Sequence, residues 1–399
     1  MAPIGSFACK GFRKMNASVE ILPIDDGHKA QLKTFLDVPY RLYHGHPAWH
    51  PPLRFERADQ ISRSKNPNAQ DLDRQLFIAR RGADVVGRIA AFLNPQHREH
   101  YQDGAGHFGY FDCEPQPDTG AALLLAAENW LKAKGARKII GPTSHSVNEE
   151  SGLLIDGFEH PNVLMMPYGR PDYPKMVEQA GFKKAIDLLA YRADHTKGIT
   201  PTPLMKRMRQ IFDADDGLTV RKLDMSNFTN EVSLAMSIFN DAWSENWGFV
   251  PMTDAQISYT AKELKPIIFS EGYRLAMIDG QPAAFIWMIP NINEAVRDLD
   301  GHLMPFGWAK LIARLKLKKI KTARVPLMGL RKEYQNTKRG LAALARICEE
   351  AMMAGTQQGF DYCELSWILE DNKGMRTICD QAGAKVYKTY RMYEKALTS

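Results

Sequence analysis

Residues 325–342 combine a glycine, two basic side chains and the start of a helix in a pattern that can bind a phosphate group. A buried strand leads into a segment made of Gln335, Asn336, Thr337, Lys338, Arg339, Gly340 and Leu341. The first N–H groups of a helix have no intrahelical acceptors, and the helix dipole adds partial positive charge. Lys338 and Arg339 add charge directly, and Gly340 lacks the Cβ that would keep a phosphate away. We predict a pyrophosphate site here; the alternative is an ordinary strand–helix turn with solvated basic residues.

The elements that must position this loop occur twice along the chain, as judged from hydrophobic periodicity and turn residues. In the first half the pattern predicts helix 28–43, hairpin 76–93, strand 107–111, helix 119–135, strand 138–141, helix 174–181 and strand 185–192. The second half repeats this order with helices 227–243 and 253–264, hairpin 274–289, strand 323–330, helix 340–358, strand 361–369, helix 372–382 and strand 385–394. An α/β (α+β) fold made by internal duplication explains the repeat; two unrelated α/β domains are the alternative.

This repeat divides the chain into a domain over residues 16–195, a linker over 196–216 and a domain over 217–399. The first domain has its own loop before the equivalent helix, residues 114–120, but with the opposite character. Two prolines remove amide donors there, and two acidic residues would repel a phosphate. We predict that this degenerate copy binds phosphate poorly and is better suited to a scaffolding role.

Composition narrows the class of protein. The chain has 399 residues and a formal net charge of +6, with no apolar run near the ~18 residues that span a bilayer and no signal-peptide pattern. Its five cysteines are an odd number without CxxC spacing, which argues against a disulfide framework or a zinc site. His44, His46 and His50 lie close together but lack a fourth ligand, so we expect no metal. We expect a cytoplasmic protein that does not bind nucleic acid.

The 335–340 loop resembles the cofactor loop of the GNAT acyltransferase superfamily, Q/R-x-x-G-x-G/A. Here it is Gln335-x-x-Lys338-x-Gly340, with a lysine in place of the first glycine. Residues 362–372, which end at Asn372, resemble the fifth strand and the entry to the fourth helix of that family. The resemblance implies two tandem GNAT domains with mixed, mostly antiparallel sheets. It also implies acyl-CoA as a co-substrate, not permanently bound, held by residues 335–341 and Asn372 with its pantetheine between two splayed strands.

Six further segments resemble more narrowly the tandem-GNAT proteins that include the bacterial ceramide synthases: 40–53, 86–91, 107–111, 141–158, 243–249 and 363–372. The resemblance implies transfer of a long-chain acyl group to the amine of a sphingoid base, in sphingolipid biosynthesis. One alternative is a GNAT acetyl- or acyltransferase that acts on a small polar amine or a protein lysine. Another is a non-catalytic regulator that binds lipid or nucleotide.

Acyl transfer to an amine needs a base, because an alkylammonium group has a pKa of about 10. Glu364 on the 361–369 strand is one candidate, and we expect partial burial to raise its pKa. Glu149 and Glu150 are a second option, and His145 titrates in the right range. Structural ion pairs and an ordinary loop histidine are the alternatives. The family's acid, a tyrosine before the last glycine, falls on Cys379 here, so Tyr390 is a substitute.

Two sets of residues, rich in aromatic side chains, are candidates for lipid contact. Trp243, Asn246, Trp247 and Phe249 are expected to line an acyl or acceptor groove, although a core role is an alternative. An insertion over residues 291–322 has an apolar helical face that includes Trp308, with basic residues beside it. A basic amphipathic helix with a tryptophan is typical of a membrane-surface element, so the expected partners include an anionic surface such as the inner membrane. The alternative is a surface helix that packs on its own domain.

Overall fold

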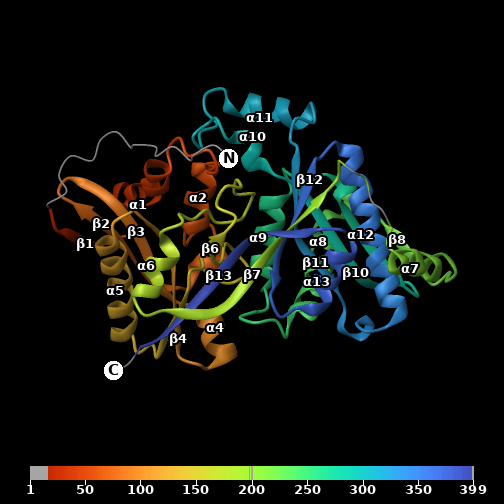
Figure 1. Ribbon diagram of the computed structural model, residues 1–399, viewed down its shortest axis with the longest axis horizontal. Coiled ribbons are helices and arrows are strands. Elements are labelled where there is room, and N and C mark those ends of the chain that lie inside the picture. Colours follow the sequence, from red (N-terminus) through yellow and green to blue (C-terminus); the bar gives the residue numbers. More distant parts are fainter. Residues whose placement is uncertain (1–16, 197, 199–200, 398–399) are drawn as a thin grey trace, which may run out of the picture.

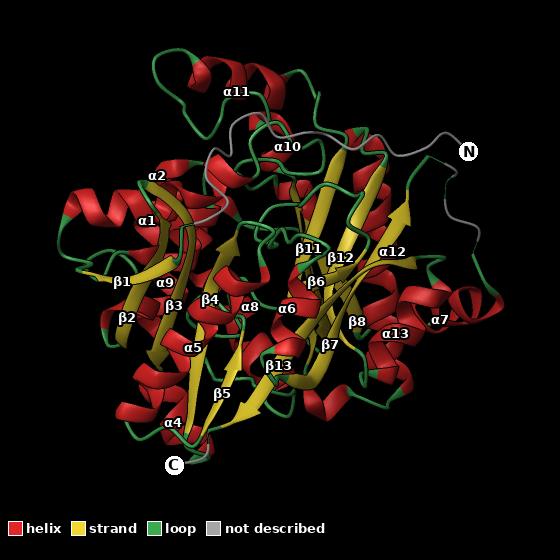
Figure 2. Ribbon diagram, turned by 60° about the vertical axis from the view of Figure 1, so that its left-hand side comes forward, coloured by secondary structure: helices red, strands yellow, loops and turns green. Residues whose placement is uncertain are grey.

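A computed structural model describes residues 17–196, 198 and 201–397. Its strands form one continuous 13-stranded sheet with helices on both faces (Figures 1 and 2). The strands are β1 (Val19–Ile24), β2 (Asp73–Arg81), β3 (Asp84–Leu93), β4 (Ala105–Cys113), β5 (Lys138–Gly141), β6 (Leu153–Asp156), β7 (Lys183–Asp194), β8 (Leu218–Arg221), β9 (Tyr273–Ile278), β10 (Gln281–Pro290), β11 (Thr322–Leu330), β12 (Tyr362–Leu369) and β13 (Lys385–Ala396).

The helices follow the same duplicated order. In the N-terminal half, residues 17–196, they are α1 (Lys29–Leu42), α2 (Arg54–Ile61), α3 (Pro67–Gln70), α4 (Pro95–Tyr101), α5 (Pro117–Ala133) and α6 (Tyr173–Gln179). In the C-terminal half, residues 201–397, they are α7 (Pro203–Asp213), α8 (Phe228–Trp243), α9 (Asp254–Leu264), α10 (Ile292–Val296), α11 (Gly307–Lys316), α12 (Lys338–Gln358) and α13 (Lys373–Gln381). Short 3-10 helices cover Met225–Asn227, Ser270–Gly272 and Lys332–Tyr334.

The order of the strands shows how the two halves are joined. It runs β1-β2-β3-β4-β5-β13-β7-β12-β11-β10-β9-β8. From one edge, five strands of the N-terminal half are followed by β13; from the other edge, the five equivalent strands of the C-terminal half are followed by β7. The last strand of each half therefore lies beside the fifth main strand of the other half: β13 pairs with β5, and β7 pairs with β12. Among the strand pairs of the described residues, only β4–β5 and β11–β12 are parallel. The predicted tandem GNAT fold with a mixed, mostly antiparallel sheet is confirmed, but the two sheets are fused into one.

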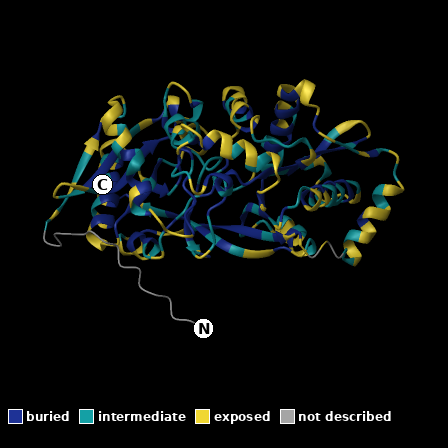
Figure 3. Cartoon of the chain, turned by 90° about the horizontal axis from the view of Figure 1, so that it is seen from above, coloured by how far each residue is buried: buried dark blue, intermediate teal, exposed yellow. Residues whose placement is uncertain are grey.

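Alternation along the strands creates a core on each face of the sheet. In β10, Ala284 and Ile286 pack under α12, while Phe285 and Trp287 face α8. The N-terminal half repeats this arrangement with α5 and α1. Buried residues (dark blue) accordingly follow the strands, and exposed residues lie on the outer helices (Figure 3). The sheet is thereby fixed from both sides, which is what positions the loops at the strand ends.

Two segments differ from the sequence-based expectation. The predicted linker contains α7, which packs on α12, and linker residues 197, 199 and 200 lie outside the described residues. The domain division at 196–216 stays a prediction, since strands of each half pair with the other half. The 291–322 insertion forms α10 and α11; α11 lies at the periphery above α10 (Figure 2), with Leu311 and Leu315 packed against the core of the C-terminal half. Within the described ranges, none of the helices combines the length and hydrophobicity that crossing a bilayer requires.

Candidate functional site

The C-terminal half contains a large cavity between two diverging strands. β11 and β12 pair in parallel only from Thr322–Val325 against Tyr362–Leu365, and beyond this point they separate. A cavity of about 810 Å³ lies between their free ends and is closed by α7, α12 and α13. Its lining is largely apolar and includes Met208, Met328, Leu344, Met352, Leu365 and Ile368. The space suits an extended ligand with an apolar part.

The first turn of α12, where the sequence predicted a phosphate site, forms one rim of this cavity. The predicted cofactor residues that line the cavity are Gln335, Asn336, Thr337, Lys338, Leu341 and Asn372. Thr337 is the N-cap, and its Oγ1 accepts a hydrogen bond of 3.0 Å from the Gly340 N–H. The helix dipole and the Lys338 side chain therefore both place positive charge at the rim.

Arg339 and Gly340 do not line this cavity. The Arg339 guanidinium binds two carboxylates. Asp215 lies in the segment between α7 and β8, and Asp279 lies in the β9–β10 turn. A Cβ on Gly340 would lie 2.1 Å from the carbonyl oxygen of Tyr334. The glycine is thus required by a backbone contact beneath the loop, which is a different reason from the close approach of phosphate that the sequence indicated.

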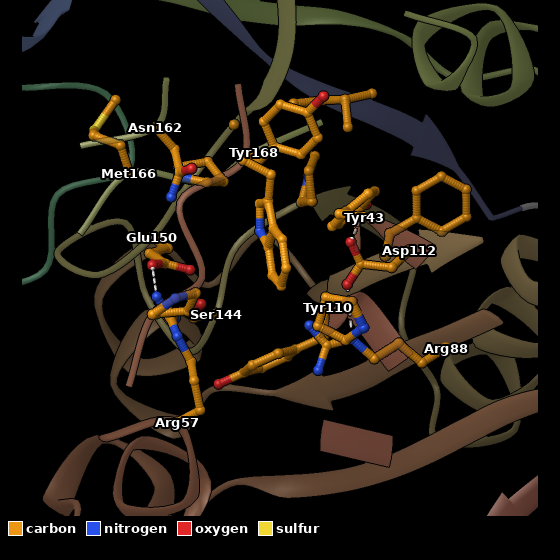
Figure 4. Close-up of a pocket in the computed structure, with 18 of the residues that line it drawn as sticks. Tyr43, Arg57, Arg88, Tyr110, Asp112, Ser144, Glu150, Asn162, Met166 and Tyr168 are labelled. Carbon is orange, nitrogen blue, oxygen red and sulfur yellow. Dashed lines mark hydrogen bonds and ion pairs between the residues drawn. The ribbon is translucent and has the colours of Figure 1, made fainter. Parts of the chain in front are cut away.

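The corresponding strand gap of the N-terminal half, whose lining residues are drawn in Figure 4, holds a much smaller cavity. β4 and β5 pair only over Ala105–His107, and past that point a cavity of about 100 Å³ lies between residues 110–112 and 142–144. Aromatic side chains fill the rest of the gap: Tyr40, Tyr43, Trp49, Phe111 and Tyr168. Its polar wall includes two ion pairs, Arg57–Glu150 and Arg88–Asp112.

The start of α5 is closed to anions, unlike the start of α12. Arg81 donates to the carboxylates of Glu114 and Asp118, each at 2.9 Å. The Thr119 hydroxyl also donates to Glu114, at 2.8 Å. The acidic residues that the sequence singled out are therefore held across the helix start, where a phosphate would have to bind. This geometry supports the prediction of a degenerate loop.

A hydrogen-bonded chain stands behind the wall of the small cavity. Tyr110 lines the cavity, and its hydroxyl lies 3.3 Å from Nε2 of His145. Nδ1 of His145 in turn bonds the Glu149 carboxylate, which also accepts from the side-chain amides of Asn66 and Asn68 at 3.1 and 3.0 Å. Burial raises the pKa of Glu149, but the neighbouring imidazole and the amide donors outweigh it and lower the pKa overall. The carboxylate is therefore ionised at neutral pH.

The two cavities approach each other at one contact. Met166 lines the small cavity and Ser366 lines the large one. The Ser366 hydroxyl lies 3.5 Å from Sδ of Met166. A thin wall of side chains thus separates a polar pocket in one half from an apolar cavity in the other.

Known proteins share this architecture and much of the sequence. The chain is 42% identical over 370 residues to Protein YghO of Escherichia coli, covering 93% of this chain and 94% of that protein. It is 41% identical over 389 residues to the bacterial ceramide synthase of Caulobacter vibrioides, covering 97% of this chain and 100% of that protein. A solved tandem GNAT protein from the clavulanic acid biosynthesis pathway matches with a TM-score of 0.55 over 96% of this chain and 99% of its own, at 12% identity, which supports the fold alone. No family model matches the chain.

The chain belongs to the tandem-GNAT acyltransferase family. It is an acyltransferase, and in that context the buried Glu364 is the first candidate base to consider. Both Glu364 and Lys388 are completely buried, and their charged groups lie 3.2 Å apart. The carboxylate also accepts from the hydroxyls of Ser366, at 2.6 Å, and Tyr387. Glu364 lines none of the cavities described above.

The pKa of Glu364 moves in the opposite direction from the one expected. Burial raises it, but the charges of Lys388 and Arg324 and the hydroxyl donors outweigh burial and lower it. The sequence-based expectation of a raised pKa was wrong because it considered only the neighbours along the strand. The partners Arg324 and Lys388 come from β11 and β13, and sequence spacing gave no signal for them. In this acyltransferase Glu364 therefore has the environment of a structural ion pair.

Tyr390 and the predicted groove residues of the 243–249 segment differ in how far they are buried in the acyltransferase. Tyr390 is fully buried on β13, burial raises its pKa well above the usual value, and its hydroxyl has no hydrogen-bond partner among the described residues. Trp243, Asn246 and Trp247 line the large cavity, and the Trp243 indole N–H donates to the Met328 carbonyl at 3.0 Å. Phe249 is buried behind them. The structure thus brings three of these four groove candidates to one wall.

Trp308 lies elsewhere. It is on α11, half exposed, and its indole N–H bonds the carbonyl of Pro305 within the insertion. It does not line the large cavity; the α11 side chains that pack on the domain core are Leu311 and Leu315. Residues that the sequence did not single out contribute to the small cavity, namely Arg57, Tyr110 and Met166. The backbone of Tyr110 is distinctive in the structure, because its φ of 50° is unusual for a tyrosine in a strand.

Proposed function

We propose that this acyltransferase moves a long-chain acyl group from acyl-CoA to the amine of a sphingoid base, as a step in sphingolipid biosynthesis. The observation that carries the proposal is the 810 Å³ cavity, which joins a positively charged helix start to a long apolar interior. The diphosphate would bind at Gln335, Thr337, Lys338 and Asn372. The acyl chain would then lie along the methionine- and leucine-rich lining. The 41% identity to the ceramide synthase of Caulobacter vibrioides supports the choice of substrates.

The chemistry requires no covalent enzyme intermediate. A neutral amine attacks the thioester carbonyl, the C–N bond forms, the C–S bond breaks, and the CoA thiolate leaves with a proton. The amine must first lose a proton, because its pKa of about 10 keeps it protonated near neutral pH. Glu149 and His145 form a hydrogen-bonded acid–base pair suited to this task, whereas Glu364 is engaged with Lys388. We propose the histidine pair, with Glu150 near it, as the base system.

The test is incubation of the purified full chain with palmitoyl-CoA and sphinganine, with the amide product identified by mass spectrometry. Parallel reactions contain acetyl-CoA with a small polar amine, and acetyl-CoA with a lysine peptide. We expect the ceramide-type amide to be the main product. Turnover only with the polar amine or the peptide would instead show a short-chain acetyltransferase. If the protein binds palmitoyl-CoA but forms no amide in any of the reactions, it would be a regulator.

We propose further that the protein is cytoplasmic and contacts an anionic membrane surface through α11. The exposed apolar side chains of the insertion are Met304, Phe306, Trp308, Ile312 and Leu317. Lys316, Lys318 and Lys319 are exposed beside them, while Arg314 is paired with Asp298. An apolar ridge flanked by free lysines matches the two attractions that hold a protein on an anionic leaflet.

A further inference from the structure

The small cavity of the N-terminal half opens toward the solvent through a groove between α1 and α2. The groove has a volume of about 960 Å³, and its lining includes Leu32, Leu36, Tyr40, Phe55, Arg57 and Ala58. Leu36, Tyr40 and Arg57 line both the groove and the cavity, so the two are adjoining parts of one path. Phe55 is 52% exposed on the groove wall although it is a large apolar side chain. The groove wall thus combines these apolar side chains with charged ones from α1 and α2, namely Lys29, Lys33, Asp37, Arg41 and Arg54, and the inner end of the path is polar.

The insertion that carries α11 forms the outer wall of this groove. Arg54 on α2 donates to the carbonyl and the carboxylate of Asp300, at 2.9 and 3.0 Å, and the Arg54 N–H donates to the Gly301 carbonyl. A Cβ on Gly301 would lie 2.6 Å from the Pro52 carbonyl oxygen, which shows how closely the insertion is packed here. The exposed apolar side chains of the insertion begin at Met304, just after His302, which itself lines the groove. The groove therefore opens beside the apolar surface of α11.

The charges at the inner end favour a cation. Arg57 is paired with Glu150 and Arg88 with Asp112, so these four groups balance. Glu149 is a third carboxylate, and His145 is its only ion-pair partner in the described part of the chain. The hydrogen-bonded chain of Tyr110, His145 and Glu149 therefore connects the cavity to a carboxylate that no lysine or arginine of the described residues pairs with. An ammonium group in the cavity would add a positive charge near this carboxylate.

We propose that this path is the acceptor site: the amine-bearing polar head of a single-chain lipid occupies the small cavity, and its hydrocarbon chain lies in the α1–α2 groove toward α11. This inference rests on the proposed N-acyl transfer and assigns its acceptor to the N-terminal half. The strand gap that does not bind acyl-CoA would thus have become the acceptor pocket. Tyr110 is the group that touches the amine, and His145 and Glu149 act through it.

The proton path follows from the hydrogen bonds. In the neutral tautomer that donates Nδ1–H to Glu149, Nε2 of His145 accepts from the Tyr110 hydroxyl. The ammonium gives one proton to the Tyr110 oxygen as the tyrosine proton moves to Nε2, which yields a neutral amine and an imidazolium paired with Glu149. The amine attacks the thioester carbonyl once the Met166 and Ser366 side chains, which separate the two cavities, have moved apart. The C–N bond forms, the thiolate leaves with the second amine proton, and the imidazolium returns its proton to solvent.

The first experiment separates acceptor binding from acyl-CoA binding. Phe55→Glu places a charge on the groove wall, and Leu125→Glu places the same charge on an equally exposed site of α5, 55% exposed, away from the path. We expect Phe55→Glu to raise KM for sphinganine at least tenfold while KM for palmitoyl-CoA is unchanged. We expect Leu125→Glu to behave like the wild type. Equal KM values for sphinganine in the two variants would overturn the proposal.

The second experiment tests the proton path in a way that a structural role would not reproduce. We expect Glu149→Gln to lower kcat by about 100-fold, within the range of general-base contributions, with both KM values nearly unchanged. The shape of the side chain is kept, and the thermal midpoint checks folding. A lower thermal midpoint with an unchanged kcat of the folded fraction would show that Glu149 has only a structural role, and this would overturn the proposed proton path.

A direct binding measurement distinguishes failure of this inference from failure of the proposed function. A fluorescent C18 amine is titrated into the wild type, Phe55→Glu and Leu125→Glu without acyl-CoA. If the wild type makes no amide but binds the amine, and Phe55→Glu alone loses at least tenfold in affinity, the acyl-transfer proposal fails and the site stands. If the wild type makes amide and all three bind the amine equally, the site assignment fails and the function stands.

Discussion

The two strand gaps of this acyltransferase have the same topology and very different contents. In the C-terminal half, β11 and β12 enclose about 810 Å³ beside an open helix start. In the N-terminal half, β4 and β5 enclose about 100 Å³, because aromatic side chains from residues 40–49 and 168 fill the space. Arg81 also ties two carboxylates across the start of α5. The comparison shows that the sheet creates the gap, while side chains from loops decide how much of it stays open.

Blocking the large gap should have the largest effect. Ala345 lies on α12 and lines the cavity, so Ala345→Trp should weaken palmitoyl-CoA binding about a thousandfold, or about 4 kcal/mol. Ala121 lies exposed in the first turns of α5, and Ala121→Trp should leave the affinity unchanged. Titration calorimetry measures both. Similar losses in the two variants would mean that the gaps are not functionally different.

The second-largest effect is expected on stability, from the buried ion pair between Glu364 and Lys388. Glu364→Gln leaves Lys388 buried without its carboxylate and should lower the free energy of unfolding by about 3 kcal/mol near neutral pH. Because the pKa of Glu364 is lowered from 4.5 in the folded state, its contribution is complete above that value and is lost as the pH falls through the lowered pKa. Urea unfolding across this pH range should show the two proteins converging. Glu370→Gln, at a partly exposed pair with Lys184, should cost less than about 1 kcal/mol.

The two neighbouring basic residues of the loop sharpen the comparison further. Lys338 lines the large cavity, so Lys338→Gln should weaken CoA binding about tenfold through the loss of one charge–phosphate contact. Arg339 is held by Asp215 and Asp279, so Arg339→Gln should change CoA affinity less than twofold. Competition against a labelled acyl-CoA provides the measurement. The reverse order of effects would place the diphosphate on the other side of the helix start.

The smallest expected effect concerns the insertion, which the N-terminal half replaces with the short α4. Charge reversal of Lys310 or Lys318 should weaken binding to vesicles rich in anionic lipid by about fivefold each, since a basic residue near such a surface contributes about 1 kcal/mol. Lys132→Glu on α5 is the matched control, and it should bind as the wild type does. Sedimentation with vesicles measures the effect. Unchanged binding in all variants would remove α11 from the membrane contact.

The sequence by itself determined the order of elements and the difference between the two helix starts. Local periodicity identifies helices such as α12, and local chemistry distinguishes the proline- and acid-rich 114–120 loop from the 335–340 loop. These features depend on residues within a few positions of one another. Because they are local, the structure shows these features almost as the sequence predicted them.

Only the tertiary structure decided the exchange of β7 and β13, the lowered pKa of Glu364, the engagement of Arg339 with two carboxylates, and the joining of Tyr110 to His145. Each of these depends on groups that are distant in sequence, in one case the 124 positions between Asp215 and Arg339. Strand partners and the balance between burial and nearby charge are set by long-range packing. No local pattern in the chain encodes them.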